Sequence, residues 1–313
     1  MPVITRANIV QGPCQITYDG STFWSKGDVS LQPVFERFDV ETSAFGKVDS
    51  RLKSKRYEVS FEPVGLVTSA LIAVLWPYGA FATGTSLFGA TDRPLVICGR
   101  DGIRVTLVNA ALTQMPSIRM GVGVTFAGQC KFTALLANAT AVTATAAYLT
   151  IATSAVPAET GWAASDILTQ PTVGTWGSAP WDFFEVDSPG WEITPSLKTQ
   201  PVSTDGLGMV DMLMAGLEVT ARAIPVGPTV AQILTAMTAA GELGSSASAA
   251  GTELILRSGT TPKAVTVTVY NAGMISSQLV WSAAAKRVSQ CTWAATRTVT
   301  TSTADPLFAV AIA

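Results

Sequence analysis

Histidine is absent from the 313-residue sequence, and only 13% of the residues are charged. Without histidine the chain lacks the commonest general base, the commonest metal ligand and the usual activator of a serine or cysteine nucleophile. We therefore expect no enzyme active site, no cofactor and no metal centre. Soluble proteins carry about 25% charged residues. So neutral a surface predicts that partner molecules cover much of it.

Strong positive charge, cysteine motifs and membrane-spanning runs are also missing. The formal net charge of −2 does not indicate a nucleic-acid binder. Four cysteines occur without CxxC spacing, so we expect buried, reduced thiols. The N-terminal stretch MPVITRANIVQGP has no apolar run, so we expect no signal peptide. Residues 63–91 are uncharged, but only 66–76 resemble a helix, too short for a span of about 20 residues, and we expect no membrane insertion.

What the sequence does contain is an internal repeat. Several short matches appear when the second half of the chain is laid over the first, and a nearly constant offset holds from residue 32 to the last residue. We therefore predict two tandem copies of one domain, 1–160 and 161–313. The Gly-, Thr-, Ser- and Pro-rich stretch 161–180 resembles a linker or an extended crossing segment. The matches include Val48-Asp49 with Val210-Asp211, Pro63-Val64-Gly65 with Pro225-Val226-Gly227, Asn109-Ala110 with Asn271-Ala272, and Gln129-Cys130 with Gln290-Cys291.

Each copy has the periodicity of antiparallel strands around one helix. Residues 56–62 and 218–223 alternate apolar and polar side chains, as a half-buried strand does, and so do 103–109 and 265–271. A helix is predicted over 65–76, ended by Pro77, and over 229–240, ended by Gly241. Further β-rich stretches follow at 119–136, 144–152, 278–300 and 307–313. The predicted fold is mainly β with one short helix per domain, an antiparallel β-sandwich or barrel in each copy.

Long excursions separate the early strands of each copy, at residues 36–55 and 198–215. Such excursions in compact domains are usually functional or disordered. The first is rich in charge and the second in apolar residues, and Met-rich surfaces are often binding surfaces. We expect the apolar run of the second to form an exposed patch that contacts a partner. The residues concerned are Asp39, Glu41, Lys47, Asp49, Arg51 and Lys53 in the first, and Met209, Val210, Asp211, Met212, Leu213 and Met214 in the second.

This arrangement resembles the phage tail tube (major tail protein) family. The resemblance lies in a first strand pair, an extended loop with a Gly-x-Val-Asp-x-x-Leu core at residues 46–52, a strand of the form RYEVSFEP at 56–63, and one short helix. The second copy keeps the sequence GMVDML at 208–213 but loses the RYEVSFEP wording. The likeness is closest over positions 1–65, and the repeat extends it to the whole chain.

The resemblance implies a structural virion protein that assembles with itself. Tube domains of this family join their inner sheets edge to edge in a ring, and stacked rings form a helical polymer whose lumen conducts DNA at genome ejection. A duplicated chain would form trimeric rings with pseudo-sixfold symmetry, stacked head to tail. The implied partners are the tail tip or baseplate, the tail terminator, the tape measure protein in the lumen before ejection, and DNA passing non-specifically. The implied location is the phage tail, after synthesis in the host cytoplasm.

Within this picture the two excursions are the expected ring-stacking arms. The charged arm would set register, and the apolar arm would supply most of the affinity, because exposed ion pairs contribute only about 0–1 kcal/mol each. DNA must slide through the tube, so we expect polar strand faces without excess positive charge to line the lumen. Residues 56–62 carry two carboxylates against one arginine, which predicts weak repulsion. The candidate lumen-facing residues are Arg56, Glu58, Ser60, Glu62, Glu218 and Thr220.

Two other classes of protein stay open. One is a different β-rich virion or cell-surface structural protein, such as a decoration or capsid-associated protein. The other is a carbohydrate-binding module or enzyme on a β-sandwich, with Trp176, Trp181 and Trp191 as a sugar platform. Asp182 and Glu185 do not make a good catalytic pair, because residues three apart on one strand point to opposite faces.

Overall fold

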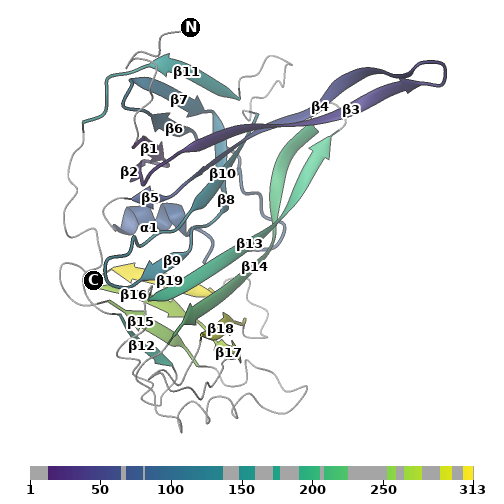
Figure 1. The fold of residues 1–313 in the computed structure, drawn as a ribbon. Coiled ribbons are helices and arrows are strands. Elements are labelled where there is room, and N and C mark those ends of the chain that lie inside the picture. The colour runs from purple at the N-terminus through teal and green to yellow at the C-terminus, as the bar shows by residue number, and fades with distance from the viewer. Residues whose placement is uncertain are drawn as a thin grey trace, which may run out of the picture.

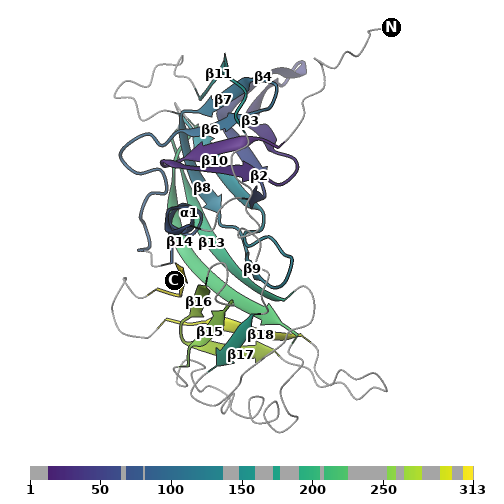
Figure 2. The same ribbon diagram turned by 90° about the vertical axis from the view of Figure 1, so that its left-hand side faces the viewer.

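The protein is described here by a computed structural model, which is mainly β, with four antiparallel sheets and one helix in the described part of the chain (Figures 1 and 2). The structure describes residues 13–64, 68–79, 82–136, 148–158, 172–176, 190–204, 208–224, 252–258, 264–276, 290–297 and 306–312. No helix in these ranges is long and apolar enough to cross a membrane. The elements are β1 (Gln15–Tyr18), β2 (Ser21–Ser25), β3 (Ser30–Thr42), β4 (Gly46–Phe61), β5 (Pro63–Val64), α1 (Ser69–Leu75), β6 (Leu95–Cys98), β7 (Ile103–Leu107), β8 (Asn109–Gln114), β9 (Ile118–Met120), β10 (Cys130–Leu135), β11 (Leu149–Thr153), β12 (Val173–Trp176), β13 (Trp191–Thr204), β14 (Gly208–Ala223), β15 (Leu254–Arg257), β16 (Val265–Val269), β17 (Ala272–Ser276), β18 (Cys291–Ala295) and β19 (Phe308–Ile312).

Two packed sheets form the N-terminal half. One has the strand order β11-β7-β6-β1-β2-β5 and the other β3-β4-β10-β8. Aromatic side chains fill the space between them: the Tyr18 ring of β1 lies 4.8 Å from the Phe132 ring of β10, and Phe23 of β2 lies 5.9 Å from Phe61 of β4. Burial of rings of this size is a main source of stability in a sandwich core.

The C-terminal half repeats this construction with the orders β12-β15-β16-β19 and β17-β18-β14-β13-β9. Two tryptophans take the places of Tyr18 and Phe132 between its sheets: Trp176 of β12 lies 6.3 Å from Trp293 of β18. Val265, Val267 and Val269 of β16 are fully buried, as the alternation of residues 265–271 predicts.

The pairing of strands follows the sequence repeat closely. The run β1-β6-β7-β11 corresponds to β12-β15-β16-β19, and β3-β4-β10-β8 corresponds to β13-β14-β18-β17. The offset that relates Val48 to Val210 also relates β4 to β14 at both of their ends. The register of the β3–β4 pair shifts after Glu36, and that of β13–β14 shifts at the equivalent place, after Lys198. Among the described residues, Val48-Asp49 and Cys130 therefore lie at the same positions in their strands as Val210-Asp211 and Cys291.

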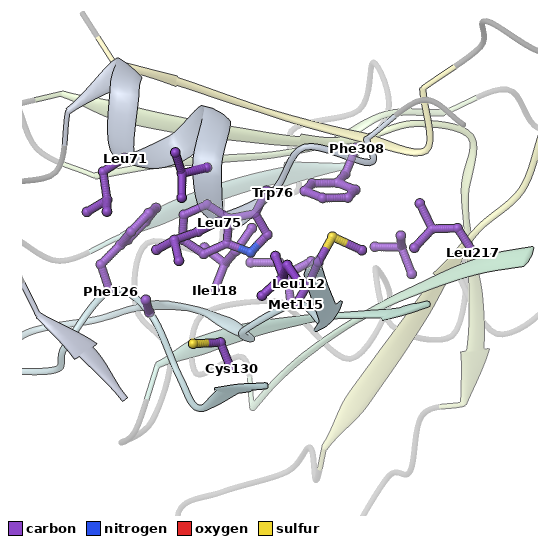
Figure 3. Packing of buried hydrophobic residues seen from close by; sticks show 14 of the residues in the cluster. Leu71, Leu75, Trp76, Leu112, Met115, Ile118, Phe126, Cys130, Leu217 and Phe308 are labelled. Carbon is purple, nitrogen blue, oxygen red and sulfur yellow. The ribbon is translucent and has the colours of Figure 1, made fainter. Parts of the chain in front are cut away.

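The two halves share one hydrophobic core at a seam between them. β9 of the N-terminal half pairs with the start of β13, so it extends a C-terminal sheet. Trp76, which follows α1, packs between Ile118 and Phe308 of β19 (Figure 3). Its Nε1–H donates to the carbonyl oxygen of Pro116 at 2.8 Å, and the Leu307 amide donates to the carbonyl of Gly79 at 2.9 Å. The halves are thus fixed to each other by backbone and side-chain contacts.

Several expectations about local structure are confirmed. The helix α1 ends at Leu75, directly before Trp76 and Pro77, and the Thr68 side chain caps its N-terminus by accepting from the Leu71 amide. Its expected start at residue 65 is too early, because the helix begins at Ser69. The alternation of residues 56–62 and 218–223 gives one buried and one more exposed face in both strands. Cys98, Cys130 and Cys291 are buried, whereas Cys14 is only half-buried.

Other expectations are wrong or lie elsewhere. Residues 36–55 and 198–215 are not loops, because both belong to long β-hairpins. The segment 161–180, expected as a linker or an extended crossing segment, contains the strand β12, which favours the second alternative there. Ile103 is 45% exposed instead of facing the core. The second expected helix, 229–240, lies outside the described residues.

Candidate assembly surfaces

Two hairpin arms are the most extended parts of the molecule. We define the first arm as residues 36–55 of β3–β4 and the second arm as residues 198–215 of β13–β14. In Figure 1 the first arm projects beyond the body, whereas the second arm runs along the body toward the base of the first. Gly46 and Gly208 begin the return strands with φ of +66° and +69°, a backbone region that side chains other than glycine adopt at a cost. The local geometry of the two arms is therefore alike.

The second arm is docked on the N-terminal half of its own chain. The Gly84 amide donates to the Met214 carbonyl at 2.8 Å, and the Met214 amide donates to the Thr85 carbonyl at 2.8 Å. The Ser86 hydroxyl donates to Asp211 Oδ1 at 2.7 Å. Met209 and Met214 are buried, with 7% and 6% of their surface exposed. The expectation of an open apolar patch over Met209–Met214 is therefore wrong for these two methionines, while Val210 remains 36% exposed.

The first arm is covered among the described residues only at its base, where Ser54 lies under Gly208 and is 5% exposed. Its tip and strands expose Phe38 (48%), Phe45 (83%), Val48 (50%) and Leu52 (53%). The expected division into a charged first arm and an apolar second arm is therefore wrong, because the first arm presents large apolar side chains as well. Its charged side chains form solvent-exposed ion pairs within the arm: Lys47 Nζ lies 2.8 Å from Asp39 Oδ1, and Arg51 Nε lies 3.1 Å from Asp49 Oδ2. Glu41 and Lys53 are also exposed. Such pairs contribute about 0–1 kcal/mol each.

A polar face covers the sheet of β3, β4, β10 and β8. Glu58 contacts Arg56 (Nε–Oε1, 3.1 Å) and Lys131 of β10 (Nζ–Oε2, 2.6 Å). Burial disfavours the charge on Glu58, but hydrogen bonds from Lys131 and Arg56 outweigh it and hold the pKa of this carboxyl below its usual value. Glu62 has the same balance of causes, with Thr125, Lys26 and Arg119 as its partners, and its pKa is also lowered. The expected surplus of negative charge along residues 56–62 is therefore neutralised by lysines and arginine from neighbouring segments.

The C-terminal sheet carries a matching polar face. Lys198 contacts Glu218, and Arg222 contacts Glu192, across the β13–β14 pair. A groove of about 690 Å³ lies at the seam and is lined by side chains of β8, β13 and β14, including Thr220 and Gln114. It adjoins a second groove of about 240 Å³ that is lined by Glu58 and Ser60, and both grooves share Gln114 and Gln129. Of the candidate lumen residues, Glu58, Ser60 and Thr220 thus line two adjoining grooves, and Arg56, Glu62 and Glu218 take part in ion pairs on the same two sheets.

The edges of the two equivalent sheets differ, and the sequence gives no sign of this. In the C-terminal half, β9 pairs with β13 and covers Trp191 (1% exposed) and Ile193 (0%). In the N-terminal half β3 is an edge strand in the described part of the chain, and Leu31, the counterpart of Ile193, is 37% exposed. A long strand with an open edge is a template for pairing with another chain.

The three tryptophans of the expected sugar platform do not form one among the described residues. Trp191 is buried against Trp293, with ring centres 5.3 Å apart, so it cannot serve as part of a sugar platform. Trp181, Asp182 and Glu185 lie outside the described residues. Within the described ranges no cluster of three cysteines, aspartates or glutamates is placed to hold a metal ion. Comparison with models of known protein families found no matching family, and no curated protein matches the chain significantly.

Proposed function

We propose that this protein is a structural subunit that assembles with itself into rings, and that the rings stack into the DNA-conducting tube of a phage tail. The observation that carries the proposal is the difference between two equivalent sheet edges, those of β13 and β3. β9 of the N-terminal half pairs with the start of β13, at Trp191–Ile193, whereas the corresponding part of β3 has no strand at that edge among the described residues. The C-terminal half of a second copy can close β3 in the same head-to-tail sense.

Head-to-tail contacts close into a ring when the rotation between subunits divides the circle. In the proposed ring the two halves of one chain stand in this relation at the seam, so a ring of three chains would contain six similar positions. Each new contact would bury apolar side chains such as Leu31, each burial contributing about 1.5–3 kcal/mol at most. The duplication of a tube domain and the trimeric, pseudo-sixfold ring are parts of this proposal.

The polar faces of the two sheets are the candidate wall of the channel. Each of their carboxylates contacts a lysine or arginine, which leaves little free positive charge to hold phosphates. A wall rich in unpaired cations would bind DNA through counterion release and retard it. The charge pairing therefore favours a channel through which DNA slides without sequence recognition. In a virion the tube would also meet the tape measure, tail tip and terminator proteins.

The test compares two lysine substitutions at similarly exposed apolar residues. Leu31→Lys places a charge at the open edge of β3, and Ile103→Lys places one on β7, inside a different sheet. Mass photometry and negative-stain electron microscopy of concentrated protein would measure assembly. We expect rings of three 32.6 kDa chains and tubes for the wild type and Ile103→Lys, and monomers for Leu31→Lys.

Two results would overturn the proposal. A wild-type protein that stays monomeric at high concentration would exclude self-assembly. Equal assembly of Leu31→Lys and the wild type would exclude the β3 edge as the contact. Binding to a glycan array without ring formation would instead favour a carbohydrate-binding module.

A further inference from the structure

The second arm packs on the N-terminal half of its own chain, and the first arm makes no equivalent contact among the described residues. The docked second arm therefore serves as a template for the contact that the first arm could make. Gly208 packs so closely on β4 that a Cβ atom built there would lie 2.2 Å from the Ser54 Cβ atom. This contact and the hydrogen bonds to residues 84–87 hold the second arm on the N-terminal half, that is, on the half that precedes it in the chain.

The repeat gives a counterpart for each side of this contact. Gly208 corresponds to Gly46 at the tip of the first arm, and Ser54 corresponds to Gly216 on β14. Gly46 has no described heavy atom within 4 Å of its Cβ position, and Gly216 has only the Lys198 side chain, at 3.7 Å. Both sides of the counterpart contact are therefore open in the described structure.

Individual side chains of the first arm match those that the second arm uses in its contact. Leu52 is the counterpart of Met214; Leu52 is 53% exposed, whereas Met214 is 6% exposed. Asp49 Oδ1 accepts from the Ser50 amide at 2.7 Å, and its counterpart Asp211 accepts from the Met212 amide at 2.7 Å. The first arm thus has the local shape of the docked arm but lacks its cover.

We propose that the first arm docks laterally on the C-terminal half of a neighbouring copy of this chain in the same ring, with Gly46 against Gly216. The inference rests on the proposed ring and specifies one of its contacts. The occupant is a second copy because the contact repeats the one made within the chain: the second arm lies on the N-terminal half, and the matching surface for the first arm is a C-terminal half, which a neighbouring copy supplies. Lateral docking replaces the expected role of this arm as a contact between stacked rings.

The first experiment uses two substitutions on β4 that differ only in the predicted contact. Leu52→Asp removes the counterpart of the buried Met214, whereas Val48→Asp changes the counterpart of Val210, which stays 36% exposed in the docked arm. Because burying a leucine side chain contributes about 1.5–3 kcal/mol and about 1.4 kcal/mol is tenfold, we expect Leu52→Asp to weaken ring formation at least about tenfold per contact. Val48→Asp should still form rings. Both monomers should unfold at the wild-type temperature, because both sites are exposed.

The assembly state of each variant (monomers, free rings or stacked rings) distinguishes lateral docking from the alternatives. Monomers from Leu52→Asp alone support lateral docking. Free rings from Leu52→Asp that fail to stack would show that the arm joins rings, and equal loss of rings in both variants would show that the template does not apply. Either result overturns the inference, while wild-type rings would still support the proposed function. A wild type that forms no rings would instead overturn the proposed function.

A second experiment locates the receptor without relying on a loss of assembly. In a Cys14→Ser background, Phe45→Cys and Gly216→Cys are treated with a short bis-maleimide under assembly conditions. Position 45 directly precedes Gly46, with about 3.8 Å between the two Cα atoms, and the ordinary spacing at Gly216 accommodates a side chain. We expect chain-to-chain products from the double variant and none from either single variant. Products from Phe45→Cys alone would mean that two arms meet tip to tip, and an uncross-linked double variant in intact rings would equally overturn the inference.

Discussion

Gly208→Ala should destabilise the free chain much more than the same change at Gly46. Both glycines have left-handed φ values, +69° and +66°, so alanine incurs a similar backbone cost of about 1–2 kcal/mol at each. The effect of Gly→Ala on the unfolded chain is also similar and cancels in the comparison. Only the surroundings differ, because nothing described approaches Gly46, whereas an added Cβ at residue 208 would lie 2.2 Å from Ser54 Cβ and 2.9 Å from the Lys53 carbonyl oxygen.

The clash at residue 208 involves backbone, so the second arm must move. Displacement breaks its backbone hydrogen bonds to residues 84–87, each contributing about 0.5–1.5 kcal/mol, and exposes part of Met209 and Met214. We expect an additional loss of about 2–4 kcal/mol relative to Gly46→Ala, which is in the range of severe single substitutions.

Urea unfolding of the two variants measures the difference in the free energy of unfolding. Hydrogen exchange gives a local reading, because the amides of Gly84, Leu87 and Met214 should lose protection in Gly208→Ala and keep it in Gly46→Ala. A difference below about 0.5 kcal/mol, with those amides still protected, would refute the tight docking of the second arm.

Two further predictions concern the polar face and the seam. Glu62→Gln should lower the free energy of unfolding at neutral pH, because the lowered pKa of Glu62 means that its ionised form favours the folded state. This contribution is present above the usual carboxyl pKa of about 4.3 and disappears as the pH falls through the lower folded-state pKa. A deficit of the variant that stays constant down to pH ~2 would contradict the prediction. Trp76→Phe should lower the free energy of unfolding by about 1–3 kcal/mol, because it leaves the buried Pro116 carbonyl without the Nε1–H donor. If the variant unfolds at the same temperature as the wild type, this hydrogen bond does not stabilise the seam.

The periodic parts of the fold could be predicted from the sequence. Side chains on a strand alternate between two faces, so residues 56–62 indicated in advance that Val59 and Phe61 would be buried. Pro77 indicated the end of α1, because proline cannot continue a helix. The internal repeat indicated equivalent strands, because one pairing register places each matched residue at the same position in its sheet.

The arms show where such reasoning stops. A hairpin with both faces in solvent needs no alternation, and β3 is exposed along most of its length, so its sequence resembled a loop. The burial of Met209 and Met214 depends on residues 84–87, a segment far away in the chain that no local pattern can reveal.

Leu31 and Ile193 show the same limit of sequence-based prediction, because they are equivalent in the repeat but differ in burial. Leu31 and Ile193 occupy matching places on β3 and β13, and both are apolar, as a core-facing position requires. Ile193 is buried and Leu31 is 37% exposed, because the covalent chain brings an N-terminal half to the edge of β13 and brings nothing described to the edge of β3. The sequence by itself determined which side chains can be buried. The tertiary structure decided which of them the chain can bury alone, because a single chain with two similar halves contains only one seam between them.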